Sequence, residues 1–260
     1  MSEPEILWEI RDGIGWITFN RPAARNALTF AMYERLGEIC GQAGTDRAIR
    51  ALVLTGAGEK AFAAGTDISQ FRAFATAADA LAYEARLDRV LEALERCPKP
   101  TIAAIGGACT GGGAGIAAAC DLRIAAAGAR FGFPVARTLG NCLSMANYAR
   151  LAALIGPARV TEIVFTARLI GAEEALALGL VSEVLDDHPA LLSRAAALAQ
   201  TVAGHAPLTL AATKEALRRL RPRLAEGEDK DLILMCYLSR DFREGMEAFL
   251  AKRAPVWQGD

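Results

Sequence analysis

Short apolar runs alternate with longer, more widely spaced apolar patterns through the first half of the chain. Runs of about four to eight apolar residues are typical of buried strands, and apolar residues three and four positions apart are typical of amphipathic helices. Such runs predict strands over 6–10, 16–19, 51–55, 101–105 and 121–126. The spacing predicts helices over 31–39 and 80–97, and Pro98 ends the second helix.

The second half of the chain has a different pattern. From residue 144 onward it is mainly helical, and 181–184 predicts a further strand. Helices are predicted over 191–202, 208–220, 232–238 and 242–251. Repeated strand–helix units followed by a helical part indicate an α/β protein. We therefore expect a core over residues 1–200 and a helical C-terminal region over 201–260.

The composition allows a large packed core and gives little reason to expect a highly charged partner. Hydrophobic residues make up 53% of the 260 residues, and the formal net charge is −1. This near balance gives no electrostatic case for binding nucleic acid or an anionic membrane. No apolar run approaches the roughly 18 residues that indicate a membrane span. We expect neither nucleic acid nor a membrane as a partner.

The chain start and the cysteines favour a cytoplasmic protein. The first residues are acidic, with no basic segment before an apolar one, so no signal peptide is expected. The six cysteines form no C-x-x-C pair and are scattered through apolar stretches, which is typical of reduced thiols. The only histidines are His188 and His205, so we expect no histidine-based metal site.

A glycine-rich stretch, Gly111–Gly115, lies between the predicted strand 101–105 and an alanine-rich helix start. Glycines there let a ligand approach the backbone, and free N–H groups at a helix start can face an anion. Close packing of the helix on the strand requires small residues equally well, so both interpretations stay open. The stretch matches neither the dinucleotide fingerprint, because Ile116 stands at its third glycine, nor a phosphate loop.

A second loop, 61–68, follows the predicted strand 51–55. One interpretation is that a turn at Gly65 directs the N–H of Thr66 into a cleft. An ordinary surface loop is the alternative.

Six segments have the motifs, order and spacing of one known family. They are FNRP at 19–22 with RNAL at 25–28, ALVLTG at 51–56, AFAAGTDI at 61–68, KPTIAAIGGACTGGGAG at 99–115, ACDLRIA at 119–125 and DFREGMEAFLAKRAPVW at 241–257. On these motifs the chain resembles the enoyl-CoA hydratase/isomerase family of the crotonase superfamily over essentially its whole length. The resemblance implies a spiral of ββα units with a helical C-terminal trimerisation region, and a homotrimer or homohexamer.

The same resemblance implies an acyl-CoA substrate and a backbone oxyanion hole. Carried over by position, the two donors are the N–H groups of Thr66 and Gly112. Reactions of this family put negative charge on the thioester carbonyl oxygen, and two fixed N–H groups stabilise that enolate. Coenzyme A enters as part of the substrate, and no permanently bound cofactor is implied.

Contacts to coenzyme A are implied at two places. Arg25, with Ala27, stands where the family often has a basic residue near the phosphates, and Lys252 matches a basic residue that reaches the cofactor from a neighbouring subunit. Plain solvated charge is the alternative for both basic residues. The loop from 63 to 68 is implied to contact the adenine and pantetheine, and its residues in this role are Ala64, Asp67 and Ile68. Asp67 is also expected to cap a turn or helix start.

Both glutamates that hold and activate water in family hydratases are missing. Gly115 stands at the first position, and Val135, after Phe131-Gly132-Phe133-Pro134, stands at the second. Neither glycine nor valine transfers a proton, so hydration by the usual mechanism is doubtful.

The next segment departs from the family as well, and Asn141 and Cys142, with Val135, are expected to line the acyl pocket. A buried, inert thiol is the alternative for Cys142.

Three hypotheses follow. The first is a lyase or isomerase that uses substitute acid–base groups. The second is a decarboxylase of a malonyl-type CoA, which needs the enolate site and no base to create the enolate. The third is a catalytically weak CoA-binding protein.

Overall fold

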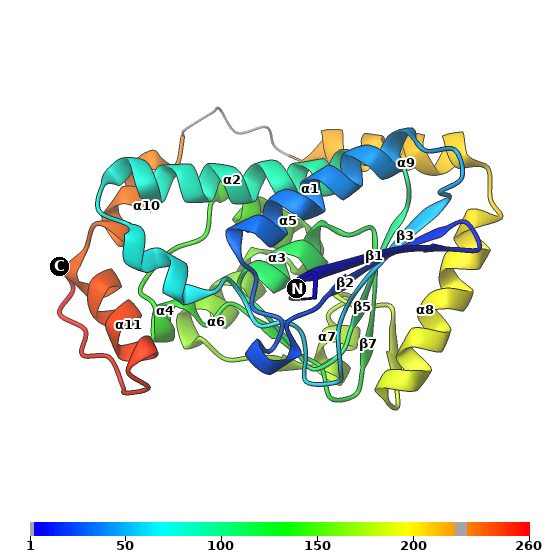
Figure 1. Cartoon of the computed structure of the whole chain (residues 1–260). Helices are drawn as coiled ribbons and strands as arrows, with labels where there is room; N and C mark the ends of the chain where they lie inside the picture. Colours follow the sequence, from blue (N-terminus) through cyan, green and yellow to red (C-terminus); the bar gives the residue numbers. More distant parts are fainter. Residues whose placement is uncertain (1–2, 222–227) are drawn as a thin grey trace.

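The computed structural model describes residues 3–221 and 228–260, and within them two β-sheets organise the fold (Figure 1). The six-stranded sheet has the order β1-β2-β3-β5-β7-β10. Its strands are β1 (Ile6–Arg11), β2 (Ile14–Phe19), β3 (Ala51–Gly56), β5 (Thr101–Ile105), β7 (Leu122–Ala126) and β10 (Glu183–Leu185). The four-stranded sheet has the order β4-β6-β8-β9. Its strands are β4 (Ala61–Ala63), β6 (Ala108–Thr110), β8 (Arg130–Gly132) and β9 (Ile170–Gly171).

Successive units of the chain each give one strand to each sheet and then a helix. β3 and β4 are followed by α2 (Ala77–Arg96), β5 and β6 by α3 (Gly112–Ala119), and β7 and β8 by α4 (Val135–Thr138). Within each sheet the strands of successive units pair in parallel. This is the expected α/β spiral of ββα units, and the fold class is confirmed.

The remaining helices cover the sheets and form the C-terminal part. They are η1 (Pro22–Ala24), α1 (Phe30–Thr45), η2 (Ile68–Ala73), α5 (Met145–Ile155), α6 (Pro157–Thr166), α7 (Ala172–Ala177), α8 (His188–Ala203), α9 (Pro207–Leu220), α10 (Lys230–Tyr237) and α11 (Arg240–Leu250). α1 and α2 run side by side, and α8 packs on the six-stranded sheet (Figure 1).

Both faces of the six-stranded sheet are buried at its central strands β3 and β5, which explains the continuous apolar runs in these strands. In β3, Leu52 and Leu54 point into the larger of two apolar clusters, and Ala51 and Val53 point into the smaller one, which α8 covers with Leu191 and other residues. Side chains alternate between faces along a strand, so one short run supplies both clusters.

Most predicted elements have nearly the observed limits. The strand 101–105 agrees with β5, and the helix predicted from 80 begins at Ala77, because Thr76 caps it. The hydroxyl of Thr76 accepts the N–H of Asp79, and the Asp79 carboxylate accepts the N–H of Thr76. The four-stranded sheet was missed, because strands of two or three residues carry no periodic pattern. α8 spans the expected boundary at residue 200.

The C-terminal helices contact the core at one end and expose apolar residues elsewhere. α10 packs on α2, and α11 packs on η2. α9, which was predicted to be amphipathic, has no buried residue in the single chain, and Leu208, Leu217 and Leu220 are exposed. Across residues 3–221 and 228–260, none of the helices combines the length and the apolar character needed to cross a membrane.

Candidate active site

Two loops meet at one edge of the four-stranded sheet. β4 and β6 are parallel neighbours, so the loops that follow them leave the sheet side by side. Gly65 and Thr66 belong to the first loop, Gly111 forms the second, and Gly112 begins α3. A Cβ atom placed on Gly111 would lie 3.5 Å from the Cα atom of Gly65, and one placed on Gly112 would lie 3.3 Å from the Thr66 hydroxyl oxygen. The structure therefore brings Thr66 and Gly112, the two residues predicted from the sequence, close together.

The main-chain N–H groups of Thr66 and Gly112 have no acceptor within the described part of the chain. Both residues are half-buried. Gly112 is the first residue of α3, where helical geometry leaves the N–H groups without internal partners and the helix dipole is positive. Two unpaired donors in neighbouring loops favour an electronegative atom of a ligand.

The glycines of the stretch Gly111–Gly115 allow both close packing of the helix and approach of a ligand to the backbone, the two interpretations of the sequence. A Cβ atom on Gly113 would lie 2.2 Å from the carbonyl oxygen of Ala63, so a glycine allows α3 to pack on β4. A Cβ atom on Gly112 would lie 1.9 Å from the hydroxyl oxygen of Tyr33, so a glycine there lets a polar group approach the backbone. Packing explains the first glycine and close approach explains the second.

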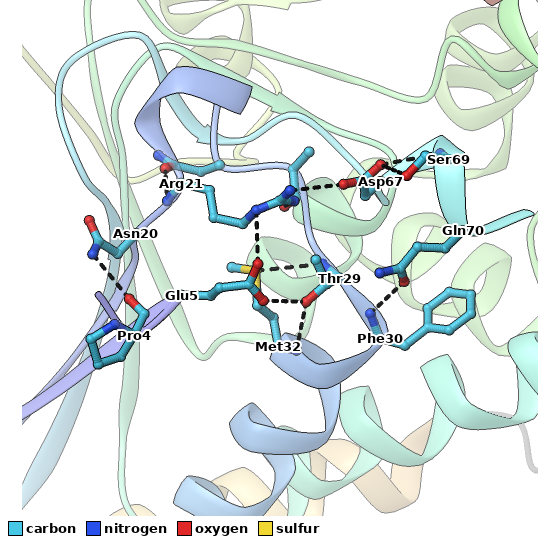
Figure 2. Close-up of polar contacts among 12 residues, drawn as sticks. Pro4, Glu5, Asn20, Arg21, Thr29, Phe30, Met32, Asp67, Ser69 and Gln70 are labelled. Atoms are coloured by element: carbon cyan, nitrogen blue, oxygen red, sulfur yellow. Dashed lines mark hydrogen bonds and ion pairs between the residues drawn. The ribbon is translucent and has the colours of Figure 1, made fainter. Parts of the chain in front are cut away.

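A network of hydrogen bonds holds the Thr66 loop (Figure 2). The N–H of Leu28 donates to the carbonyl of Gly65, and the N–H of Asp67 donates to the carbonyl of Leu28, both at 2.8 Å. The Arg21 guanidinium donates to the Asp67 carboxylate at 2.9 Å and to the carbonyl of Ala27 at 2.6 Å. The loop is therefore fixed on both sides of Thr66.

Asp67 has the capping role expected from the sequence. Its carboxylate accepts the N–H and the hydroxyl of Ser69 at the start of η2. Partial burial raises the pKa of Asp67, but the hydrogen bonds from Ser69 and Arg21 outweigh burial and lower this pKa below its usual value. Asp67 is therefore a carboxylate at neutral pH and keeps its bond to Arg21.

The start of α1 is attached to the same network. The Thr29 hydroxyl donates to the Glu5 carboxylate at 2.7 Å and accepts the N–H of Met32, and the other oxygen of Glu5 lies 3.1 Å from Arg21 (Figure 2). Thr29 caps the helix, and Tyr33 follows one turn later. The capped turn thus sets the position of Tyr33.

The side chain of Thr66 lies between two buried tyrosines. Its hydroxyl is 2.8 Å from the Tyr33 hydroxyl and 2.7 Å from the Tyr83 hydroxyl. Burial raises the pKa of both phenols, so both stay protonated. This chain of hydroxyls could not be predicted from the sequence, because Tyr33 and Tyr83 come from different helices.

A buried carboxyl lies beside this chain of hydroxyls. Glu84 of α2 is 3% exposed, and the Tyr237 hydroxyl donates to its Oε1. Asn141 Nδ2 donates to the Tyr237 oxygen at 3.1 Å. Burial raises the pKa of Glu84 to about 8, although the bond from Tyr237 lowers it. Glu84 Oε2 and Asn141 Oδ1 have no hydrogen-bond partner among the described residues.

Sequence reasoning missed Glu84, although a signal was present. Ala80, Glu84, Leu87 and Leu91 have helical spacing and are all buried on one side of α2. A glutamate within an apolar stripe is the unusual feature that marks the position.

The remaining pocket candidates have varied surroundings. Asn141 joins the Glu84 cluster, and the half-buried Cys142 has its sulfur 3.6 Å from the carbonyl of Leu232. Val135, the first residue of α4, is buried in the core. A Cβ atom on Gly115 would lie 3.4 Å from Asn147 Oδ1, so this side chain borders the place of a glutamate.

The residues expected near coenzyme A fall into two groups. The main-chain carbonyl of the exposed Arg25 accepts the N–H of Ala64 at 3.1 Å, and the carbonyl of Ala27 accepts a hydrogen bond from Arg21. These residues therefore lie beside the Thr66 loop, which leads into η2 at Ile68. Lys252 is exposed after α11, and among the described residues no contact joins it to Arg25. No cluster of His, Cys, Asp and Glu that suits a metal ion occurs in that part of the chain.

Comparisons with known proteins agree with this architecture. The model of the enoyl-CoA hydratase/isomerase family matches residues 9–260. The chain belongs to this family. A short-chain-enoyl-CoA hydratase of Clostridium acetobutylicum is 34% identical, over 97% of each chain. The family assignment made from the motifs is therefore confirmed.

Solved structures with the same fold include enzymes of different names. One is an enoyl-CoA hydratase/carnithine racemase of Magnetospirillum magneticum, with a TM-score of 0.80, 35% identity and coverage of 100% of this chain and 97% of the other. Another is a methylmalonyl-CoA decarboxylase in complex with 2-nitronate-propionyl-CoA, with a TM-score of 0.89, 28% identity and complete coverage of both chains.

Proposed function

We propose that this member of the family acts on an acyl-CoA thioester and stabilises its enolate with the N–H groups of Thr66 and Gly112. The observation that carries the proposal is the proximity of Thr66 and Gly112, whose main-chain amides have no acceptor within residues 3–221 and 228–260. An enolate oxygen bound there gains two fixed donors and the N-terminal end of α3 without reorganisation of the protein. The enzymatic relatives support an acyl-CoA substrate.

Arg25 and the loop with Ala64, Asp67 and Ile68 are proposed to bind the coenzyme A part of the substrate. The proximity of Arg25 and Ala64 supports one continuous surface for phosphate and pantetheine. Lys252 is proposed to contribute from a neighbouring subunit of a homotrimer or homohexamer, because in the single chain no contact links it to Arg25 within residues 3–221 and 228–260.

A second candidate is decarboxylation of a malonyl-type CoA. Gly115 and Val135 supply no acid–base group, and loss of CO₂ creates the enolate without a base. The similarity to a methylmalonyl-CoA decarboxylase over the whole chain favours this candidate. Hydration by the usual pair of glutamates has no support from these two positions.

The experiment combines turnover with the binding of an enolate mimic. Crotonyl-CoA is assayed for hydration and a malonyl-CoA series for CO₂ release, and 2-nitronate-propionyl-CoA is titrated calorimetrically. Gly112→Pro, which removes one donor, is expected to lower turnover about 10²–10³-fold and to weaken binding of the mimic. Gly128→Pro is the matched control, because Gly128 is exposed in a turn with nothing within 4 Å of its Cβ position. A folded Gly112→Pro protein with unchanged turnover contradicts the oxyanion assignment.

A further inference from the structure

The buried carboxyl of Glu84 is linked to the Thr66 loop through tyrosines. The hydroxyl of Tyr33 is near Gly112, and the Glu84 carboxyl is close enough to Tyr33 for its charge to raise the pKa of that phenol. Tyr83, the neighbour of Glu84 on α2, contacts the side chain of Thr66. The ring of Tyr83 lies 6.2 Å from the ring of Tyr237, whose hydroxyl bonds Glu84, so two neighbouring tyrosines link the carboxyl to the side chain of Thr66.

The hydrogen bonds around Glu84 determine which of its oxygens carries a proton. The Tyr237 hydroxyl accepts from Asn141 Nδ2 and donates its own hydrogen to Glu84 Oε1. While Tyr237 donates to Oε1, the proton of neutral Glu84 is on Oε2. This oxygen is buried and has no acceptor among the described residues. Native proteins rarely leave a buried polar atom unpaired, so this arrangement requires an explanation.

We propose that Glu84 is the acid that transfers a proton from Oε2 to the α-carbon of the enolate held by Thr66 and Gly112. The proposal rests on the proposed function and adds the acid–base group that Gly115 and Val135 do not provide. Asn141 and Tyr237 are positioning residues, because they hold the carboxyl through Oε1 and leave Oε2 free.

The step balances for the decarboxylation candidate. The bond between the α-carbon and the carboxylate breaks, its electron pair enters the enolate, and CO₂ leaves. The enolate then forms a C–H bond with the proton of Glu84, and the O–H electron pair stays on the carboxylate. Water returns a proton to Glu84. In the opposite direction, ionised Glu84 removes an α-proton, which an isomerase or lyase of this family requires.

The surroundings of Glu84 keep it neutral over most of the physiological range. Its pKa is raised to about 8, mainly by burial and to a smaller extent by the nearby charges of Asp88 and Asp229. Asp88 is bonded to Ser144 and pairs with Arg150. Other titratable groups near Glu84 are Tyr33, Tyr83, Cys142, Tyr148 and Tyr237, and Cys236 contacts Cys142. An acid with this pKa is active below about pH 8 and loses activity above it.

The test replaces the carboxyl by its isosteric amide. Glu84→Gln keeps an oxygen to accept from Tyr237 and lacks the transferable proton. We expect kcat for CO₂ release, or for hydration if that is the activity, to fall about 10²–10⁴-fold, while the affinity for 2-nitronate-propionyl-CoA stays within threefold. The loss of activity near pH 8 is expected in the native protein and absent from the variant.

Two further variants make the test specific. Tyr237→Phe removes a hydrogen bond that lowers the pKa of Glu84, so the loss of activity is expected at higher pH. Glu95→Gln is the control, since Glu95 is a nearly buried acid on the same helix whose carboxylate is paired with Arg150 and Arg221. Its pH profile is expected to match that of the native protein.

The outcomes separate this inference from the proposed function. If Glu84→Gln retains kcat and the limb near pH 8, Glu84 is not the acid, and the oxyanion hole stands. If the native protein neither binds the nitronate nor turns over any thioester, the proposed function fails and the inference fails with it.

Discussion

Glu84 also makes the stability of the protein depend on pH in an unusual direction. Its pKa rises from 4.5 to about 8 on folding, mainly because burial disfavours the charged form. Between these values the folded state holds a proton that the unfolded state has lost. The free energy of unfolding therefore falls as pH rises, by at most about 1.4 kcal/mol per pH unit from this group.

Glu84→Gln is expected to remove this dependence. The variant gains stability relative to the native protein as pH rises from 5 to 8, by roughly 2–4 kcal/mol over that range. Urea unfolding at several pH values measures the difference. Glu95 provides a control of opposite sign: burial raises its pKa, but the bonds from Arg221 and Arg150 outweigh burial and lower it. Glu95→Gln should therefore lose most stability at neutral pH and less in acid, and parallel curves for the two variants would contradict the assignment.

At the scale of the elements, Arg21 links the loop that carries Thr66 to two other segments of the chain. Arg21 joins the Asp67 carboxylate, the carbonyl of Ala27 and the carboxylate of Glu5, so it connects the chain start, the turn before α1 and the loop before η2. Its side chain is only 23% exposed. Charge-assisted hydrogen bonds in such a place are stronger than those of a surface ion pair.

Arg21→Met is expected to loosen the Thr66 loop. Loss of bonds to charged partners predicts about 1.5–3 kcal/mol of destabilisation and a fall in kcat, because the Thr66 amide is no longer held in one direction. Denaturant unfolding and steady-state kinetics measure both effects. Arg11→Met is the control, since Arg11 makes an exposed pair with Glu9, and such pairs contribute about 0–1 kcal/mol. Equal effects of the two variants would contradict the role of Arg21.

The same elements show what the sequence can reveal and where it fails. β5 and the longer amphipathic helices, such as α2 and α8, have continuous or periodic apolar patterns, so their positions were predictable. The family motifs predicted that Thr66 and Gly112 act together, and the structure brings these two residues close to each other. The hydroxyl chain and the acid cluster were not, since Tyr33, Glu84 and Tyr237 come from three helices and meet only through the packing of α1, α2 and α10. Of these residues, only Glu84 could be noticed in the sequence, as an ionisable residue within the apolar stripe of a helix.

At the scale of the whole molecule, the apolar helix α10 is only partly covered by the rest of the chain. α10 directs Ile233 and Tyr237 inward, and its outer side exposes Leu232, Met235 and Leu238. A helix that is apolar on all sides is typically buried. We therefore expect the C-terminal region from 201 to 260 to form the subunit contact of the proposed homotrimer or homohexamer, with 222–227 outside the described residues.

Met235→Glu tests this assembly and its connection to the site. Met235 is 68% exposed, so a charge there leaves the folded chain intact but disfavours burial against a second copy. We expect light scattering to show smaller particles at micromolar concentration. Activity should fall as well, because α10 carries Tyr237, which holds Glu84, and an uncovered helix holds that tyrosine less firmly. Ile10→Glu, at an exposed apolar position on β1, should change neither the particle mass nor the activity. If Met235→Glu leaves the mass of the native particle unchanged, α10 is not the contact. If it dissociates the particle and leaves turnover unchanged, the position of Tyr237 does not depend on assembly.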